Sequence, residues 1–394
     1  MRTGRYVAGM ITARRNVRIA LLATALGMGL ASLSAPVAAG EGVTSTIEVV
    51  ADGLNAPRGI LYDADQHRVL VAEAGVRVLD DGTLPCGAAE RGLPFCLTHT
   101  GSVFQFSESG APSQRIVTGL PSAGLQIASL PVVIGVHDLT MRPGDDKLTA
   151  VFGTLGNKAY RESLGAGATL LGQAVTINGS GRIKPFADLL SFINVLYPGM
   201  EADPYGVVVG PYGTMVANAG GHVENGVSKG NDLLLVSPNG TISEVAQFPA
   251  RPPAADPTAL INTVPTSVAQ GPDGAFYVGE LSGAPFYPGE ARVWRVVPGQ
   301  SPQVYAQGFT SIVDLIFDEQ GRLIVLQTGA DPFDTSLDGA LIRIEPDGQR
   351  TVLASAGVRN PGGVAMAGPG VFYVSTMLAS GGGVGQLLRI TVDG

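Results

Sequence analysis

Polar side chains recur in this sequence at the two ends of short apolar segments, and the segments come in pairs that could form hairpins. At the start of the first segment of each pair stand Arg58, Asp138, Tyr205, Thr266, Asp314 and Gly362. At the end of the second segment stand Glu73, Gly153, Asn218, Glu280, Gln327 and Thr376. The strands of an antiparallel hairpin run in opposite directions, so these two groups should meet at one end. His137 and Asp203 lie directly beside them.

Such a gathering of oxygen atoms suits a hard cation, because Ca²⁺ binds carboxylate and amide oxygens. The candidate metal ligands are Glu73, Asp138, Asn218, Glu280 and Asp314. A divalent ion held there could polarise a carbonyl as a Lewis acid, which would make the protein a hydrolase. Alternatively, the same residues hydrogen-bond to loop backbones around a water-filled channel, with Arg58 neutralising one carboxylate. The sequence leaves both interpretations open.

The same end of the hairpins is also a candidate binding surface without catalysis. Its candidate ligand-binding residues are Arg58, Glu73, His137, Asp138, Asp203, Tyr205, Asn218, Glu280, Asp314 and Gln327. The side chains at equivalent positions of the repeat differ from one another, and such an uneven surface suits an asymmetric ligand. That ligand would be a small molecule, a glycan or a protein. His137 and Asp138 are adjacent on an extended chain and point to opposite faces, so they cannot form a base and its orienting partner. We therefore expect His137 to fix a loop.

The elements that position these residues are six copies of one unit. Each copy has a short apolar strand, a turn and a second apolar strand. The copies begin at Pro57, His137, Pro204, Pro265, Val313 and Pro361. A further pair of strands follows each copy, often around Asn-Gly or Asp-Gly, the strongest short hairpin signals. Four strands per unit at this spacing are typical of propeller blades. The sequence predicts an all-β, six-bladed β-propeller with four-stranded blades.

The two ends of the chain predict how the ring closes. The sixth unit ends on a third strand, Gln386–Val392, and a spare strand, Thr46–Val50, precedes the first unit. We expect the N-terminal strand to be the outermost strand of the last blade, which leaves no free sheet edge there. Two stretches interrupt the pattern, Asn157–Gln173 and Asp188–Tyr197, and the apolar spacing of the second predicts a short helix.

Residues 1–39 are predicted to be a signal peptide, followed by a single propeller domain over residues 40–394. The segment has a basic start, an apolar run and small residues at Val37-Ala38-Ala39. Arg14-Arg15 is a poor twin-arginine motif, so general secretion is favoured. Removing its five basic residues changes the net charge from −8 to −13. That sign argues against nucleic acids and anionic membranes as partners, and we expect a secreted or periplasmic protein.

Cys86 and Cys96 are the two cysteines of the chain. In an exported protein, a pair separated by ten residues is predicted to form a disulfide. The spacing fits no zinc motif. No glycine-rich phosphate-binding motif occurs either, so no nucleotide cofactor is predicted, and calcium is the one cofactor that the sequence suggests.

Several segments together resemble the ScyD/ScyE family of exported bacterial proteins. They are Leu54–Gly59, the loop between Cys86 and Cys96, Val136–Asp138, Asp203–Gly206, Val264–Val268 and Tyr277–Leu281. The resemblance covers nearly all of residues 40–394 and implies an exported propeller that acts as a binding or accessory protein. It supplies no catalytic residues. More distantly, the units resemble NHL repeats and the gluconolactonase-like propellers, which implies the alternative of a metal-dependent hydrolase acting on a lactone or ester.

Overall fold

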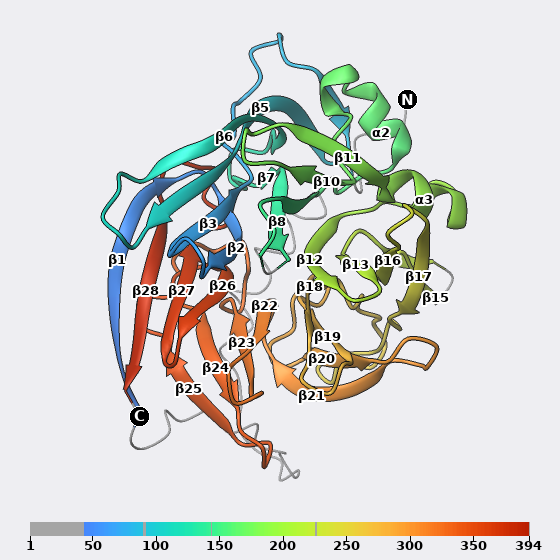
Figure 1. The fold of residues 1–394 in the computed structure, drawn as a ribbon. Helices are drawn as coiled ribbons and strands as arrows, with labels where there is room; N and C mark the ends of the chain where they lie inside the picture. Colours follow the sequence, from blue (N-terminus) through green and yellow to red (C-terminus); the bar gives the residue numbers. More distant parts are fainter. Residues whose placement is uncertain (1–42, 90–91, 143, 225–226, 394) are drawn as a thin grey trace, which may run out of the picture. The chain divides into compact units, whose positions relative to one another are not determined.

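Six antiparallel sheets surround a common axis in the computed structural model, which describes residues 43–89, 92–142, 144–224 and 227–393 (Figure 1). The predicted six-bladed propeller is confirmed. The first strands of the blades contact one another in a closed ring, in the order β2, β8, β12, β18, β22 and β26. The predicted signal peptide, residues 1–39, lies outside the described residues.

Each blade has four principal strands, and their order below runs from the axis outward. Blade 1 has β2 (Pro57–Asp63), β3 (Arg68–Glu73), β5 (Pro94–Ser107) and β6 (Gln114–Leu125), and blade 2 has β8 (Val136–Met141), β9 (Leu148–Phe152), β10 (Gln173–Ile177) and β11 (Ile183–Asp188). Blade 3 has β12 (Pro204–Gly210), β13 (Gly213–Asn218), β16 (Asp232–Val236) and β17 (Ile242–Gln247), and blade 4 has β18 (Pro265–Gln270), β19 (Phe276–Glu280), β20 (Ala291–Val296) and β21 (Gln303–Phe309).

The last two blades complete the ring. Blade 5 has β22 (Ile312–Phe317), β23 (Leu323–Gln327), β24 (Ala340–Ile344) and β25 (Arg350–Ala354), and blade 6 has β26 (Pro361–Gly368), β27 (Val371–Thr376), β28 (Gly385–Asp393) and β1 (Thr44–Leu54). Short strands decorate blades 1 and 3: β4 (Cys86–Ala88), β7 (Val133–Ile134), β14 (His222–Glu224) and β15 (Val227–Lys229).

The hydrophobic core lies between neighbouring sheets, because each blade buries both of its faces. In β3, Leu70 and Ala72 pack against blade 2. Val69 and Val71, which point the other way, pack with Tyr373 of blade 6. Strands buried on both faces read as continuous apolar runs rather than as an alternation of apolar and polar residues. This explains why the repeated units stand out in the sequence as short Val- and Leu-rich segments.

The predicted closure is confirmed. β1 pairs with β28 in antiparallel register, with Thr46 opposite Thr391 and Val49 opposite Leu388. In Figure 1 the first strand, in blue, runs beside the last strands, in red. The outer edge of β28 is therefore covered by a strand from the other end of the chain.

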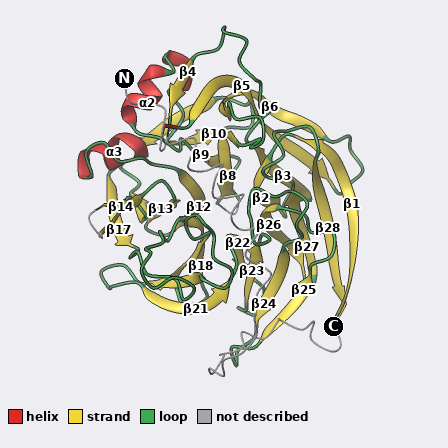
Figure 2. Ribbon diagram, turned by 180° about the vertical axis from the view of Figure 1, so that it is seen from behind, coloured by secondary structure: helices red, strands yellow, loops and turns green. Residues whose placement is uncertain are grey.

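The two predicted interruptions carry helices on the periphery, where Figure 2 shows α2 and α3 close together. They are α2 (Lys158–Ser163), a 3₁₀ turn η2 (Ala166–Ala168) and α3 (Leu189–Leu196). Asp188 caps α3 by accepting the N–H of Ser191, and Asn157 caps α2 by accepting that of Tyr160. The predicted short helix is confirmed. No helix among the described residues is long and apolar enough to cross a membrane.

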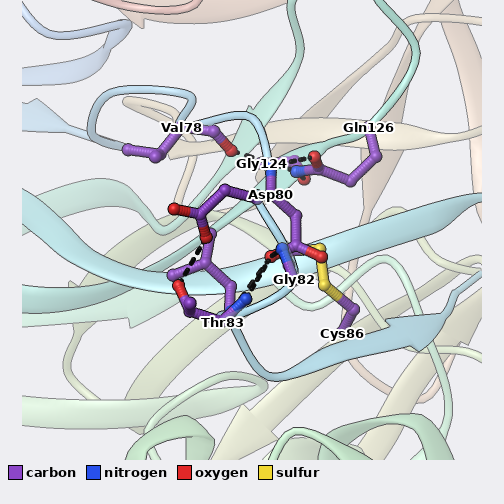
Figure 3. Close-up of a disulfide and its surroundings, with 10 residues drawn as sticks. Val78, Asp80, Gly82, Thr83, Cys86, Gly124 and Gln126 are labelled. Atoms are coloured by element: carbon purple, nitrogen blue, oxygen red, sulfur yellow. Dashed lines mark hydrogen bonds between the residues drawn. A yellow bond between two sulfur atoms is a disulfide. The ribbon is translucent and has the colours of Figure 1, made fainter.

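The predicted disulfide is confirmed between Cys86 of β4 and Cys96 of β5. Figure 3 shows it beside Asp80, whose carboxylate accepts the N–H groups of Gly82, Thr83 and Leu84. The covalent bond and this turn together hold an exposed loop that leaves blade 1.

Candidate functional site

The ring has one end at which every first strand begins and every second strand ends, and we call this end the mouth. In all six blades, the pairing of these two strands shifts by one residue at the mouth, which is a β-bulge. The bulge gives each first strand an extra residue. The second residues of the first strands are Arg58, His137, Tyr205, Thr266, Val313 and Gly362, and the third residues are Gly59, Asp138, Gly206, Ser267, Asp314 and Gly363.

This register corrects the set of equivalent residues inferred from the sequence. His137, and not Asp138, occupies the position of Arg58 and Tyr205. Asp138 and Asp314 lie one residue further along their strands. Likewise Phe152, and not Gly153, ends the second strand of blade 2. A bulge changes the direction of the side chains around it, and its presence cannot be read from a hairpin pattern.

Three of the second residues meet across the mouth. Arg58 donates from Nη1 to the Tyr205 hydroxyl at 2.8 Å and from Nη2 to the Val133 carbonyl at 2.7 Å. Its guanidinium carbon lies 5.6 Å from the centroid of the Tyr205 ring. On the same tyrosine, the His137 ring packs at 4.6 Å between centroids. Blades 1, 2 and 3 thus place an arginine, a histidine and a tyrosine in mutual contact.

His137 is 1% exposed and connects blade 2 to blade 3. Its Nδ1 lies 3.2 Å from the Pro204 carbonyl, which can only accept, so Nδ1 carries the proton. Burial, and then the Arg58 charge, hold the pKa of His137 well below its usual value, so the ring is neutral. A Cβ at Gly153 would overlap the imidazole, which explains the glycine at this point of the repeat.

Asp203 is part of the same contact region. Its Oδ1 lies 3.8 Å from Nδ1 of His137 and accepts the N–H groups of Thr154 and Leu155 at 2.8 and 3.1 Å. The carboxylate therefore ties the loop after β9 to the start of β12, beside the imidazole.

Asp138 and Asp314 stand at the third position of their strands. Burial raises the pKa of Asp138 well above its usual value, and the neighbouring Asp314 raises it further. Burial also raises the pKa of Asp314, to about 7, although two backbone N–H groups oppose the shift. A Cβ at Gly59 would overlap the Asp138 carboxylate, so only glycine fits where β2 passes this side chain.

The residues that close the second strands brace loops of their own blades. Glu73 accepts the N–H of Asn55 at 2.7 Å, and Gln327 accepts that of Thr310 at 2.9 Å. In blade 3, Asn218 accepts the N–H of Asp203 at 2.8 Å. Each of these bonds holds the segment that leads into the first strand of the same blade. They satisfy backbone groups that would otherwise be buried without a partner.

The two glutamates of this group each form an ion pair, Glu73 within blade 1 and Glu280 with the connection between blades 3 and 4. Glu73 is fully buried and accepts two bonds from Arg115, at 2.7 and 2.8 Å. Glu280 is equally buried and pairs with Arg251, and it also accepts the indole N–H of Trp294 at 2.7 Å. Burial raises the pKa of Glu280 to about 7, while Arg251 and Trp294 oppose this.

The structure does not bring the five predicted calcium ligands together. Glu73 is paired with Arg115 and Glu280 with Arg251, and Asn218 bonds to a loop backbone. Among the described residues, one group of three or more His, Cys, Asp or Glu side chains places its ligand atoms within 4.8 Å of one another: Asp80, Cys86 and Cys96. Two of its members are the disulfide cysteines. The five residues therefore do not form one cluster, and Asp138 and Asp314 are the two of them that lie close enough to influence each other.

Sequence reasoning missed the partners that determine these roles. Arg115 lies 42 residues from Glu73, and Arg251 lies 29 residues from Glu280. Neither separation belongs to a local motif, and both arginines come from parts of the blade that the repeat pattern leaves variable. The contact between Arg58 and Tyr205 spans 147 residues and follows only from the ring.

A cavity of about 500 Å³ lies where loops of blades 3 and 4 meet. It is lined by Glu201, His222, Val223, Leu260, Asn262, Gly283 and Ala284. Glu201 and Asn262 each stand three residues before the first strand of their blade, so the cavity lies on the same side of the ring as the mouth. His222 lies 3.7 Å from Glu201. None of the residues predicted from the sequence lines this cavity.

Comparison with known proteins supports the architecture. No family model and no curated protein matches the sequence. The structure is similar to that of a gluconolactonase from Xanthomonas campestris, at 10% identity and a TM-score of 0.52, over 89% of this chain and 90% of that chain.

Two further solved structures align over most of the chain. A luciferin-regenerating enzyme is 11% identical, with a TM-score of 0.49 over 88% of this chain and 95% of its own. A glucose dehydrogenase is 15% identical, with a TM-score of 0.48 over 87% of this chain and 98% of its own. At these identities the likeness concerns the fold alone, a six-bladed β-propeller.

Proposed function

We propose that this protein is an exported binding or accessory protein of the ScyD/ScyE type, and that it recognises a small polar molecule at the mouth. The supporting observation is a pair of buried nitrogen atoms. Nε of Arg58 and Nε2 of His137 have no hydrogen-bond partner among the described residues, although the two side chains are 4% and 1% exposed. Leaving buried polar atoms unpaired is costly, and a bound ligand would remove that cost.

A screen of small molecules by thermal shift tests this function. Compounds that raise the melting temperature of the natural protein are tested again on His137→Phe, which keeps a ring and removes the unpaired nitrogen. The matched control is His222→Phe, which changes the histidine of the neighbouring cavity. We expect the stabilisation to disappear in His137→Phe and to persist in His222→Phe. The reverse result would move the binding site to the cavity and overturn the proposal.

A lactone or ester hydrolase is the second candidate, and the shared fold with the Xanthomonas gluconolactonase favours it. In such an enzyme a calcium ion could polarise the substrate carbonyl. Of the five predicted ligands, only Asp138 and Asp314 influence each other electrostatically, so any such ion would have to be held by these two. The test is elemental analysis of the purified protein, together with lactone hydrolysis before and after chelation. Stoichiometric calcium and a hydrolysis rate that the chelator abolishes would establish this candidate.

Export is the remaining part of the proposal, and the predicted signal peptide supports it. The mass of the protein recovered outside the cytoplasm should correspond to a chain that begins at Gly40. A protein that keeps residues 1–39 after fractionation would contradict export by cleavage.

A further inference from the structure

The charges at the mouth are unevenly compensated, and this bears on the kind of ligand it can hold. We propose that the mouth binds a small organic anion, with a carboxylate on Arg58 and a hydroxyl group on Nε2 of His137. The inference rests on the proposed function, because it names the class of ligand for the same site. It departs from the calcium hypothesis in the sign of the charge.

The first observation concerns the charge of Arg58. Its guanidinium carries five N–H groups, and the acceptors it has among the described residues are a phenol and a backbone carbonyl, both uncharged. No ion pair among the described residues includes Arg58, although the residue is only 4% exposed. A buried charge is costly unless it is paired. By contrast Arg251, which is also buried, is paired with Glu280, and the more exposed Arg115 is paired with Glu73.

The carboxyl groups nearest the axis do not compensate this charge. Asp138 and Asp314 use their oxygens to accept backbone N–H groups. Burial raises the pKa of both aspartates, which favours their neutral form. Asp203 accepts two backbone N–H groups and lies beside His137. Arg58 therefore keeps its charge without an ion-pair partner among the described residues, in spite of the excess of acidic residues in the chain.

The second observation concerns His137, which requires a hydrogen-bond donor on the ligand. Its Nδ1 donates to the Pro204 carbonyl, so in the neutral ring Nε2 is an acceptor. The buried Nε2 has no donor among the described residues. Arg58 and His137 contact opposite parts of one Tyr205 side chain, through its hydroxyl and its ring. A ligand that satisfies both must carry a negative group and a hydrogen-bond donor a short distance apart, as a hydroxycarboxylate does.

The size of the ligand follows from burial. Because Nε of Arg58 and Nε2 of His137 are buried, only a small group could reach them, and only after neighbouring side chains move. The second residues of the other three blades are Thr266, Val313 and Gly362, which are smaller than Arg58, His137 and Tyr205.

Three small probes separate charge from hydrogen bonding. Glycolate carries both a carboxylate and a hydroxyl, acetate lacks the hydroxyl, and glycolamide is uncharged and of nearly the same size. Binding to the purified protein is measured by isothermal titration calorimetry at constant chloride concentration. We expect glycolate to bind tightest, acetate about tenfold more weakly because one hydrogen bond is lost, and glycolamide not measurably.

Two variants assign the binding to the mouth. Arg58→Met keeps the length of the side chain and removes the charge, and we expect it to abolish glycolate binding. Arg142→Met, at an exposed turn, is the matched control and should bind glycolate like the natural protein. If Arg58→Met does not fold, Tyr205→Phe replaces it. This variant removes the hydroxyl that orients the guanidinium and should weaken glycolate more than it weakens any neutral compound.

The outcomes separate this inference from the proposed function. The inference of an anionic ligand would be overturned if glycolamide bound as tightly as glycolate. It would also be overturned if neutral compounds raised the melting temperature of the natural protein but not that of His137→Phe. Either result would leave the mouth as a ligand-binding site. Glycolate binding that is unchanged in Arg58→Met would place the anion elsewhere and overturn the inference. If no compound binds in a way that depends on His137, the proposed function is overturned as well.

Discussion

Asp138 and Asp314 make the same two hydrogen bonds in blades that lie three apart around the ring. Each carboxylate accepts the N–H of the next residue at 2.8 Å, and each accepts the N–H of a residue in the first strand of the following blade, also at 2.8 Å. Asp138 thereby joins blade 2 to Val207 of blade 3, and Asp314 joins blade 5 to Val364 of blade 6. The two residues are equivalent connectors on opposite sides of the axis.

The pH dependence of stability should report on Asp314. Its pKa is about 7 in the folded protein and near 4 in an unfolded chain. A raised folded-state pKa means that its contribution is fully present below about pH 4 and is lost as the pH rises through 7. Between pH 5 and 8 the free energy of unfolding should fall by about 2–3 kcal/mol on account of this group. Urea unfolding at four pH values measures it.

The variant that isolates this effect is Asp314→Asn. It loses one hydrogen bond, at a cost of about 1 kcal/mol, so it should be less stable than the natural protein at pH 5. The difference should shrink or reverse by pH 8, because the amide cannot ionise. Asp65→Asn, at an exposed turn, is the control and should follow the natural protein. Parallel curves for Asp314→Asn and the natural protein would show that Asp314 is not the group that titrates.

Glu73 should matter for stability rather than for binding. Removing its carboxylate by Glu73→Ala leaves Arg115 without its partner and the N–H of Asn55 without an acceptor. Leaving a buried donor without an acceptor costs about 1–3 kcal/mol, while Arg115, whose side chain is 35% exposed, can turn to solvent. Urea unfolding should show this loss, whereas Glu48→Ala, on the exposed face of β1, should be nearly neutral. A Glu73→Ala protein of full stability that has lost its ligand would instead support a role at the mouth.

Deleting residues 40–50 tests the closure of the ring. The deletion removes most of β1, exposes the edge of β28 and takes away the apolar contacts of Ile47 and Val50. The lost burial and ladder bonds amount to about 3–5 kcal/mol. Deleting residues 40–42 alone is the control, because β1 begins at Thr44. Melting within a degree or two of the longer protein would contradict the importance of this strand.

The disulfide should contribute to stability through the loop it closes. Its cysteines are ten residues apart, and a loop of that length corresponds to about 2.5–3 kcal/mol in the chain-entropy account. The double variant Cys86→Ala, Cys96→Ala should show this loss in urea unfolding and should bind ligands at the mouth like the natural protein. Thiol labelling of the denatured, unreduced natural protein checks the premise, and two labelled thiols would refute it.

The fold could be predicted from the sequence because the repeat is carried by residues that packing holds constant. The apolar pairs of strands and the Asn-Gly and Asp-Gly turns predict the number of blades, and the spare strand before Pro57 predicts the closure. Asp188 and the apolar spacing after it predict α3. These are local patterns, and they survive in the structure because each blade is built from consecutive segments.

The candidate site could be predicted only as a region. The bulge at each mouth position moves Asp138 and Asp314 one residue away from the positions equivalent to Arg58. From the sequence alone, Glu73 and Glu280 are free anions that repel each other, and replacing Glu280 and Asp314 with alanine should leave the fold intact. The ion pair between Glu280 and Arg251 makes us expect a loss of stability instead.

β1 is the first strand of the chain to be synthesised, and the strand to which it hydrogen-bonds, β28, is the last. A ribosome adds roughly 5–20 residues each second, so β1 must wait for more than 300 residues to be made before its ladder can form. During this time the last blade is incomplete and the ring is open. The last blade of a chain with this topology can therefore be completed, and the ring closed, only after the C-terminal strand has been released.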